Sequence, residues 1–325
     1  MNAGTKPVSV EGASGRTGLE DAFRLVLSVL LLAVAVWAGC SGVGDRTTLL
    51  VWDPLAAACL VSLFVIFHDC AHRSFSRNRM INELTGGLCG LLLFTPLLAW
   101  RRRHLLHHSC SSNLDRRGWW DYPLLTTEEY TEMSRSRLVG YRIARSPLIA
   151  FVIAPPVFFL AVQRFPGPKP GASERLSVHA TTIGAVLLVL TLVWTFGGWR
   201  TALVLGPAFW LATATGFVIF HLQHVFPGGQ CMRNEEWSWR AAGLEGSACF
   251  GQSPAARLVI GNLGYHQAHH LEPRLSNRHL SRHRRDFGQL HGQRLMAGEM
   301  LVALRLTLWD ETRRRYVPWP ARSTP

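Results

Sequence analysis

Long apolar runs set the pattern of this chain. Four of them come close to the roughly 20 residues that a helix needs to cross a bilayer. They cover residues 22–38, 49–67, 180–196 and 201–222. Two shorter runs, 84–100 and 147–162, contain prolines, which interrupt a helix. The pattern predicts an integral membrane protein with four helical crossings and leaves the two shorter runs ambiguous.

Composition agrees with a membrane protein. Hydrophobic residues make up 48% of the chain and charged residues 17%, which is too apolar for an ordinary soluble domain. The net charge of +13 would also fit nucleic-acid binding. However, the arginines stand beside apolar runs, as they do in the cytoplasmic loops of membrane proteins. The seven cysteines form no C-x-x-C pair and are interpreted as buried thiols in a reducing compartment.

Eight histidines lie in three tight clusters, and each cluster follows or ends an apolar run. On a helix, residues three and four positions apart share a face, so each cluster points its imidazoles in one direction. Imidazole is a good ligand for iron, copper, nickel and zinc. The clusters contain His68 and His72; His104, His107 and His108; and His266, His269 and His270.

A shared metal site requires all three clusters on one side of the membrane. The runs 84–100 and 147–162 must then enter and leave on the same side, and only two crossings fit between the second and third clusters. The arginine-rich stretches fall on the same side as the clusters, the predicted cytoplasmic side. We therefore divide the chain into a flexible tail (1–20), a membrane domain with a cytoplasmic cap (21–310) and a basic C-terminal tail (311–325).

The number of imidazoles favours two metal ions, because eight exceed what one ion needs. The absence of clustered glutamates separates this set from carboxylate-rich di-iron bundles, but nitrogen ligands still suit iron, which can activate oxygen. Three other kinds of metal protein fit the clusters less well, because they would not use all three clusters or would place the histidines elsewhere. They are a zinc protease built on His68-Asp69, a haem protein with axial histidines, and a metal transporter.

The clusters and the motifs around them resemble the membrane-bound fatty acid desaturase and hydroxylase superfamily, in particular its bacterial acyl-lipid omega-6-type branch. The resemblance covers about residues 50 to 285. It rests on the three clusters together with Ser74-Phe75, Asn113–Gly118, Glu128-Glu129-Tyr130, Gln223-His224, Trp237–Arg240 and Gly261–Tyr265. Arg73, Leu105-Leu106 and Ser276 depart from the usual pattern of the family.

The resemblance implies a site with two irons and molecular oxygen as co-substrate. Gln223-His224 matches a family pattern that implies His224 as a ninth ligand, with His221 one helical turn earlier as the alternative or as a supporting residue. Metal-bound imidazoles are usually oriented by a partner on their second nitrogen. Candidates for this role are Asp69, Asn113, Asp115, Asp121 and Asn262.

The prediction is an all-α integral membrane protein with four transmembrane helices and a cytoplasmic helical cap that carries a histidine-rich di-iron site. We place it in the cell membrane, inner or plasma, where it introduces a double bond into a long acyl chain. No H-P-G-G haem motif is present, so electrons must come from a separate ferredoxin- or cytochrome-type donor. A hydroxylase, ketolase or acetylenase of the same superfamily, and a non-catalytic metal-binding membrane protein, remain as alternatives.

Overall fold

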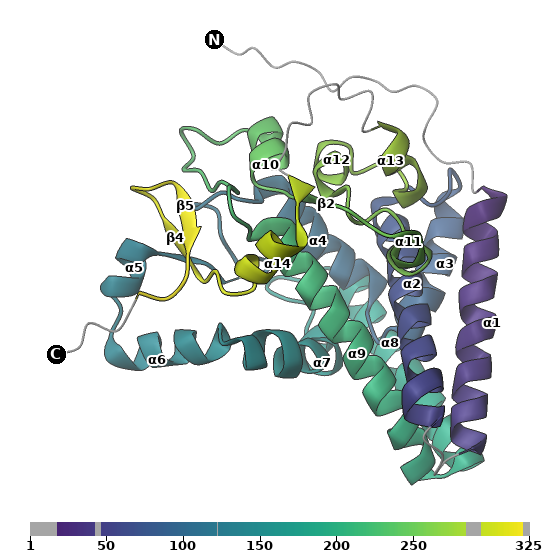
Figure 1. The fold of residues 1–325 in the computed structure, drawn as a ribbon. Coiled ribbons are helices and arrows are strands. Elements are labelled where there is room, and N and C mark those ends of the chain that lie inside the picture. The colour runs from purple at the N-terminus through teal and green to yellow at the C-terminus, as the bar shows by residue number, and fades with distance from the viewer. Residues whose placement is uncertain (1–17, 43–46, 122, 284–293, 321–325) are drawn as a thin grey trace.

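The computed structural model describes residues 18–42, 47–121, 123–283 and 294–320. Among these residues, four helices are long and apolar enough to cross a membrane, as predicted. They are α1 (Leu19–Ser41), α2 (Asp53–His72), α8 (Ala172–Phe196) and α9 (Gly198–His224). A π-helical turn, η1 (Thr48–Trp52), leads into α2. Figure 1 shows the remaining elements gathered toward one end of α2 and α9.

The two ambiguous runs form bent helix pairs. The helices α3 (Arg79–Leu92) and α4 (Leu97–Cys110) meet at 99°, and Pro96 stands immediately before α4. The segment from α6 (Arg135–Ala144) to η3 (Val162–Arg164) is bent by 53° and also contains η2 (Ile149–Ile153) and α7 (Ala154–Leu160). In Figure 1, α6 runs across the direction of α1 rather than along it. Such bends are expected of segments that enter and leave on one side.

The cap consists of short helices and strands. Its helices are α5 (Thr127–Thr131), α10 (Trp239–Glu245), α11 (Pro254–Ile260), α12 (His266–Leu271), η4 (Asn277–His279), α13 (Leu280–His283) and α14 (Ala297–Ala303). Its strands are β1 (Leu125–Thr126), β2 (Cys249–Phe250), β3 (Arg294–Leu295), β4 (Leu308–Asp310) and β5 (Arg315–Val317). One sheet has the strand order β1-β4-β5, in which β1 and β4 are parallel and β4 and β5 are antiparallel. In the second sheet, β2 pairs with β3 in parallel.

Both predicted tails differ in part from the structure. Helix α1 begins at Leu19, inside the predicted tail 1–20, while residues 1–17 lie outside the described residues. Strand β5 lies inside the predicted basic tail 311–325 and pairs with β4. The reason is packing: the buried rings of Trp309 and Tyr316 contact each other with centroids 5.1 Å apart. The basic character of this stretch concealed a strand with an apolar face.

Helix α2 is the centre of the molecule. It is buried along almost its whole length, and α1, α9, α3 and α11 pack around it. A helix that is apolar on all sides is expected to be enclosed in this way. The outer faces of α1 and α8 carry exposed large apolar side chains, such as Trp37 and Trp194, as expected of helices that face lipid.

Candidate active site

The first two imidazoles lie at the end of α2. His68 and His72 are one helical turn apart, and their ring centroids are 4.8 Å apart. The helix stops immediately afterwards, because Arg73 adopts the left-handed conformation at φ 58° and its N–H bonds back to the Cys70 carbonyl. Both imidazoles therefore point out of the membrane helix toward the cap.

Arg101 holds α4 against this end of α2. Its Nε donates to the carbonyl of Ala71 at 2.9 Å, and its Nη2 donates to the carbonyl of Cys70 at 3.1 Å. Its Nη1 pairs with Glu83 of α3 at 2.8 Å. The last carbonyls of a helix lack partners within the helix and attract positive charge. The buried guanidinium satisfies two of them and so brings the histidines of α4 next to those of α2.

The remaining predicted ligands come from α9 and α12. His224 is the final residue of α9, and the short helix α12 is buried along its whole length. The carboxylate of Asp69 accepts the backbone N–H of Asn277 at 2.8 Å, and the side chain of Asn277 accepts that of Asn262 at 2.7 Å. These two bonds tie the chain on both sides of α12 to α2. Asp69 and Asn262 therefore place the third cluster as a unit.

The nine predicted ligands come together as two adjoining groups. One group contains His68, His72, His104, His108 and His269, whose ligand atoms all lie within 4.8 Å of one another. The other contains His107, His224 and His270. His266 joins the second group, because its Nε2 lies 2.9 Å from that of His224 and 3.0 Å from that of His270. The rings of His108 and His270 stack at 4.2 Å where the two groups meet.

The spacing of the nitrogens fits metal ions. The Nε2 atoms of His104 and His108 are 3.1 Å apart, and those of His108 and His269 are 3.0 Å apart. A metal–nitrogen bond of about 2.1 Å places two ligands at right angles about 3.0 Å from each other. A histidine binds a metal in its neutral form, and the three imidazoles of α12 favour that form. In α12, burial lowers the pKa values of His266, His269 and His270 well below that of an ordinary histidine. The donor set fits two ions.

The residues predicted to orient imidazoles divide into two kinds. Asp121 lies close to a predicted ligand, with its Oδ1 3.4 Å from Nδ1 of His107. The Oδ1 of Asp69 is 3.8 Å from Nδ1 of His68, too far for a hydrogen bond. Asn113 and Asp115 instead bind the loop before α10: Asn113 donates to Asn234, and Asp115 pairs with Arg233 at 2.6 Å.

His221 lies apart from the nine predicted ligands. Its Nε2 lies 2.9 Å from the carbonyl oxygen of Ala303 in α14, and its ring contacts that of Phe151. His224, one turn later, has its Nε2 3.1 Å from that of His107. The two histidines share a sequence pattern but differ in surroundings: His224 belongs to the imidazole groups, and His221 connects α9 to the cap.

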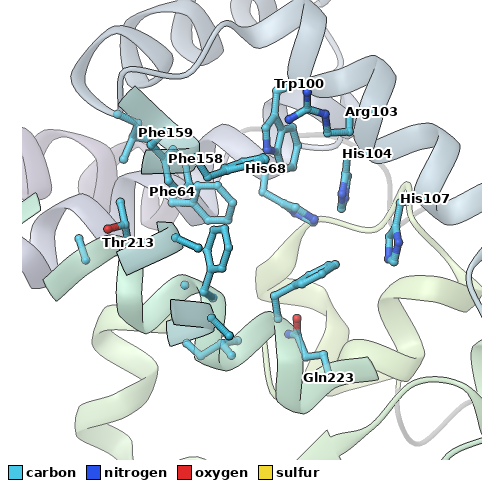
Figure 2. A pocket seen from close by; sticks show the side chains of 18 of the residues that line it. Phe64, His68, Trp100, Arg103, His104, His107, Phe158, Phe159, Thr213 and Gln223 are labelled. Carbon is cyan, nitrogen blue, oxygen red and sulfur yellow. The ribbon is translucent and has the colours of Figure 1, made fainter. Parts of the chain in front are cut away.

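An apolar cavity of about 470 Å³ reaches the histidines from the membrane helices. Figure 2 shows His104 and His107 on one side and the rings of Phe64, Phe158 and Phe159 on the other. Its far part lies between α2 and α9. The lining there includes Leu60, Val61, Phe209 and Ala212. The cavity can enclose a flexible apolar chain alongside His68, His104, His107 and His266.

Comparison with known proteins identifies the family. The family model for fatty acid desaturases matches residues 46–296. A fatty acid desaturase of Bacillus subtilis is 34% identical over 268 residues, which cover 82% of this chain and 76% of that protein. The chain belongs to the fatty acid desaturase family. An sn-1 oleoyl-lipid 12-desaturase of a Picosynechococcus species is 29% identical over 262 residues, covering 76% of the desaturase described here and 71% of the relative. A chloroplastic omega-6 desaturase of Glycine max is 26% identical over 258 residues, which cover 75% of this chain and 57% of that protein. These relatives confirm the resemblance to omega-6-type desaturases.

The sequence did not reveal the separate roles of three consecutive arginines near the site. Arg101, Arg102 and Arg103 were interpreted only as cytoplasmic positive charge. Successive residues of a helix point about 100° apart, so three consecutive arginines face different surroundings when the helix is packed on more than one side. In the desaturase, Arg101 binds the end of α2, Arg102 pairs with Glu174 and Arg103 lines the cavity.

Proposed function

We propose that this desaturase uses two irons and molecular oxygen to introduce a double bond into an acyl chain held in the apolar cavity. The observation that best supports this function is the position of the two imidazole groups along the wall of that cavity. Iron bound there would supply oxygen activation for the removal of two hydrogens from adjacent carbons. His68, His72, His104, His108 and His269 would hold one ion, and His107, His224, His266 and His270 the other.

The protein's own side chains position the substrate and exclude water. The rings of Phe64, Phe158 and Phe159 pack edge to face in the lining, with centroids 5.5–6.4 Å apart where they contact. A rigid aromatic wall restricts how an acyl chain lies against the histidines, and orientation lowers the barrier of the reaction. Attack on an unactivated carbon needs such positioning, because the carbon offers no polar group to hold.

The substrate and the electron donor are inferred from the setting of the site. Several relatives are named for lipid-linked acyl chains, and one is named as a ferredoxin-dependent sn-1 acyl-lipid omega-3 desaturase of a Nostoc species. We propose an acyl lipid as substrate and a ferredoxin-type donor. We further propose that the protein lies in the cell membrane with its cap in the cytoplasm, where reduced donors are available and where its arginine-rich cap is expected.

Expression in a bacterial membrane tests the function. We expect fatty acid profiling by mass spectrometry to show a new unsaturated product, and metal analysis of purified protein to give two irons per chain. The His107→Ala variant serves as the control: it should remain in the membrane but lose the product, because apolar burial holds the helices. A hydroxylated product would reassign the reaction, and an active protein with zinc as its sole metal would reject the iron site.

A further inference from the structure

Arg103 is a cation in the wall of a mostly apolar cavity. It lines the cavity beside Trp100 and His104 of the same helix, as Figure 2 shows. Its Nε and Nη1 are shielded from solvent and have no hydrogen-bond partner in the described part of the chain. The guanidinium lies 5.1 Å from the ring centres of Trp119 and Phe158, which hold it in place. Burial lowers the pKa of Arg103 from its ordinary value.

A second cation, Arg145, also lines the cavity. Arg145 is buried and donates from Nη2 to the carbonyl of Leu306 at 3.3 Å. Asp121 is the one carboxylate among the described lining residues, and it lies against His107. No ion pair of Arg103 occurs within the described residues. Shielding a charge from water without a partner is costly, so the site is built for an anion that arrives with a ligand.

The depth of Arg103 relative to the bilayer indicates which anion it would bind. Its neighbour Arg102 pairs with Glu174 at 3.0 Å, in the first turn of the membrane-spanning helix α8. The backbone N–H of Leu98 also bonds the hydroxyl of Ser177 in α8 at 3.2 Å. This part of α4 therefore lies level with the boundary of the bilayer, where the phosphates of lipids are found. A tryptophan, Trp119, packs against Gly167 just before α8, as is usual at that level.

We propose that Arg103 binds the phosphodiester of a glycerophospholipid whose acyl chain occupies the cavity. A guanidinium matches two phosphate oxygens with paired N–H donors. The proposal rests on the proposed desaturation of lipid-linked chains and narrows the substrate to lipids with an anionic phosphate. A neutral glycolipid with the same acyl chains would leave the Arg103 charge uncompensated. Arg103 would thus determine the head-group specificity of the desaturase.

A competition between two lipids tests the proposal. The desaturase is placed in nanodiscs with equal amounts of phosphatidylglycerol and a neutral diacyl galactolipid, whose identical acyl chains carry different isotope labels. Mass spectrometry then gives the ratio of the two desaturated products, which does not depend on iron content. We expect the wild-type protein to prefer phosphatidylglycerol by about tenfold or more. Arg103→Met should bring the ratio close to one, and Arg103→Lys should retain part of the preference.

Arg102→Met is the matched control, because Arg102 is the neighbouring arginine but pairs with Glu174 outside the cavity. It should keep the wild-type ratio. An unchanged ratio in Arg103→Met, or an absence of preference in the wild-type protein, would overturn the proposal while leaving desaturation intact. Native mass spectrometry of lipid retained on each purified variant gives a second measurement that needs no turnover. A protein that retains phosphatidylglycerol through Arg103 but forms no double bond would reject the proposed reaction and support the binding site.

Discussion

The Nε2 atom of His224 lies 2.9 Å from the Nε2 atom of His266, although 42 positions separate the two residues in the chain. The contact joins the end of a membrane helix to a short helix of the cap. It places His224 within the second imidazole group, whereas His221 faces the carbonyl of Ala303. The same helix end thus presents one histidine to the proposed metal and one to the protein.

Replacement of each histidine by alanine should distinguish the roles of His224 and His221. We expect His224→Ala to be inactive and poor in iron, because a ligand is lost. His221→Ala should retain iron and measurable activity, because only a bond to α14 is lost. Activity and iron content of the purified variants provide the measurement. The opposite order would mean that the ninth ligand is assigned to the wrong residue, and near-normal activity in both variants would leave eight histidine ligands.

Tyr316 should support His224 from the C-terminal strand. Its hydroxyl donates to the carbonyl of His224 at 2.9 Å and lies 3.1 Å from Sγ of Cys231. Burial raises the pKa of the Cys231 thiol to about 12, so this thiol stays protonated at neutral pH. We expect Tyr316→Phe to lower iron affinity and turnover by about tenfold, as is typical of changes next to a ligand.

Tyr141→Phe is the control for Tyr316. Its hydroxyl also bonds the β1-β4-β5 sheet region, at the Thr307 carbonyl 3.0 Å away, but within the described part of the chain it bonds no histidine. This variant should lose some thermal stability and keep its iron. Equal iron loss in both variants would show that Tyr316 acts only through the stability of the cap.

Loss of Arg101 should destabilise the protein more than loss of its neighbour. Arg101→Met would remove the side-chain donor of the Ala71 carbonyl and one of the two donors of the Cys70 carbonyl. It would leave Glu83 with only Arg73, 3.6 Å away, as its ion-pair partner. The expected cost is roughly 3 kcal/mol, the lower end for a broken buried pair, because Glu83 keeps this weaker partner. Arg102→Met removes a more exposed pair with Glu174, for which about 1 kcal/mol or less is expected. Thermal unfolding in detergent compares the two, and equal midpoints would contradict the assigned role of Arg101.

Surface labelling should test whether α3 and α4 return to the side they left. Met80, at the start of α3, is 63% exposed, and Leu105, after the 99° bend, is 46% exposed. Single cysteines at these positions, in a cysteine-free background, should react with a membrane-impermeant reagent from the same side. Reaction from opposite sides would be incompatible with a site shared by His72 and His104.

The sequence by itself determined the class of protein and the ligand types. Runs of about 20 apolar residues leave a chain no stable alternative to membrane helices, since every backbone group must be satisfied within the segment. The spacing of His104, His107 and His108 follows from the helix repeat alone. These features are local, so a pattern of neighbouring residues is sufficient to predict them. The family motif likewise favoured His224 over His221 before any contact was known.

Tertiary structure decided what depends on residues far apart in the chain. Helical spacing could not divide nine imidazoles into two groups, because His269 joins α2 and α4 while His270 joins α9. Nor could composition distinguish Arg101, buried at a helix end, from Arg103, shielded in the cavity wall. The hydrogen bond from Tyr316 to His224 spans 92 positions and depends on a strand that a basic sequence concealed. Each of these outcomes depends on which elements pack together, and that is a property of the whole fold.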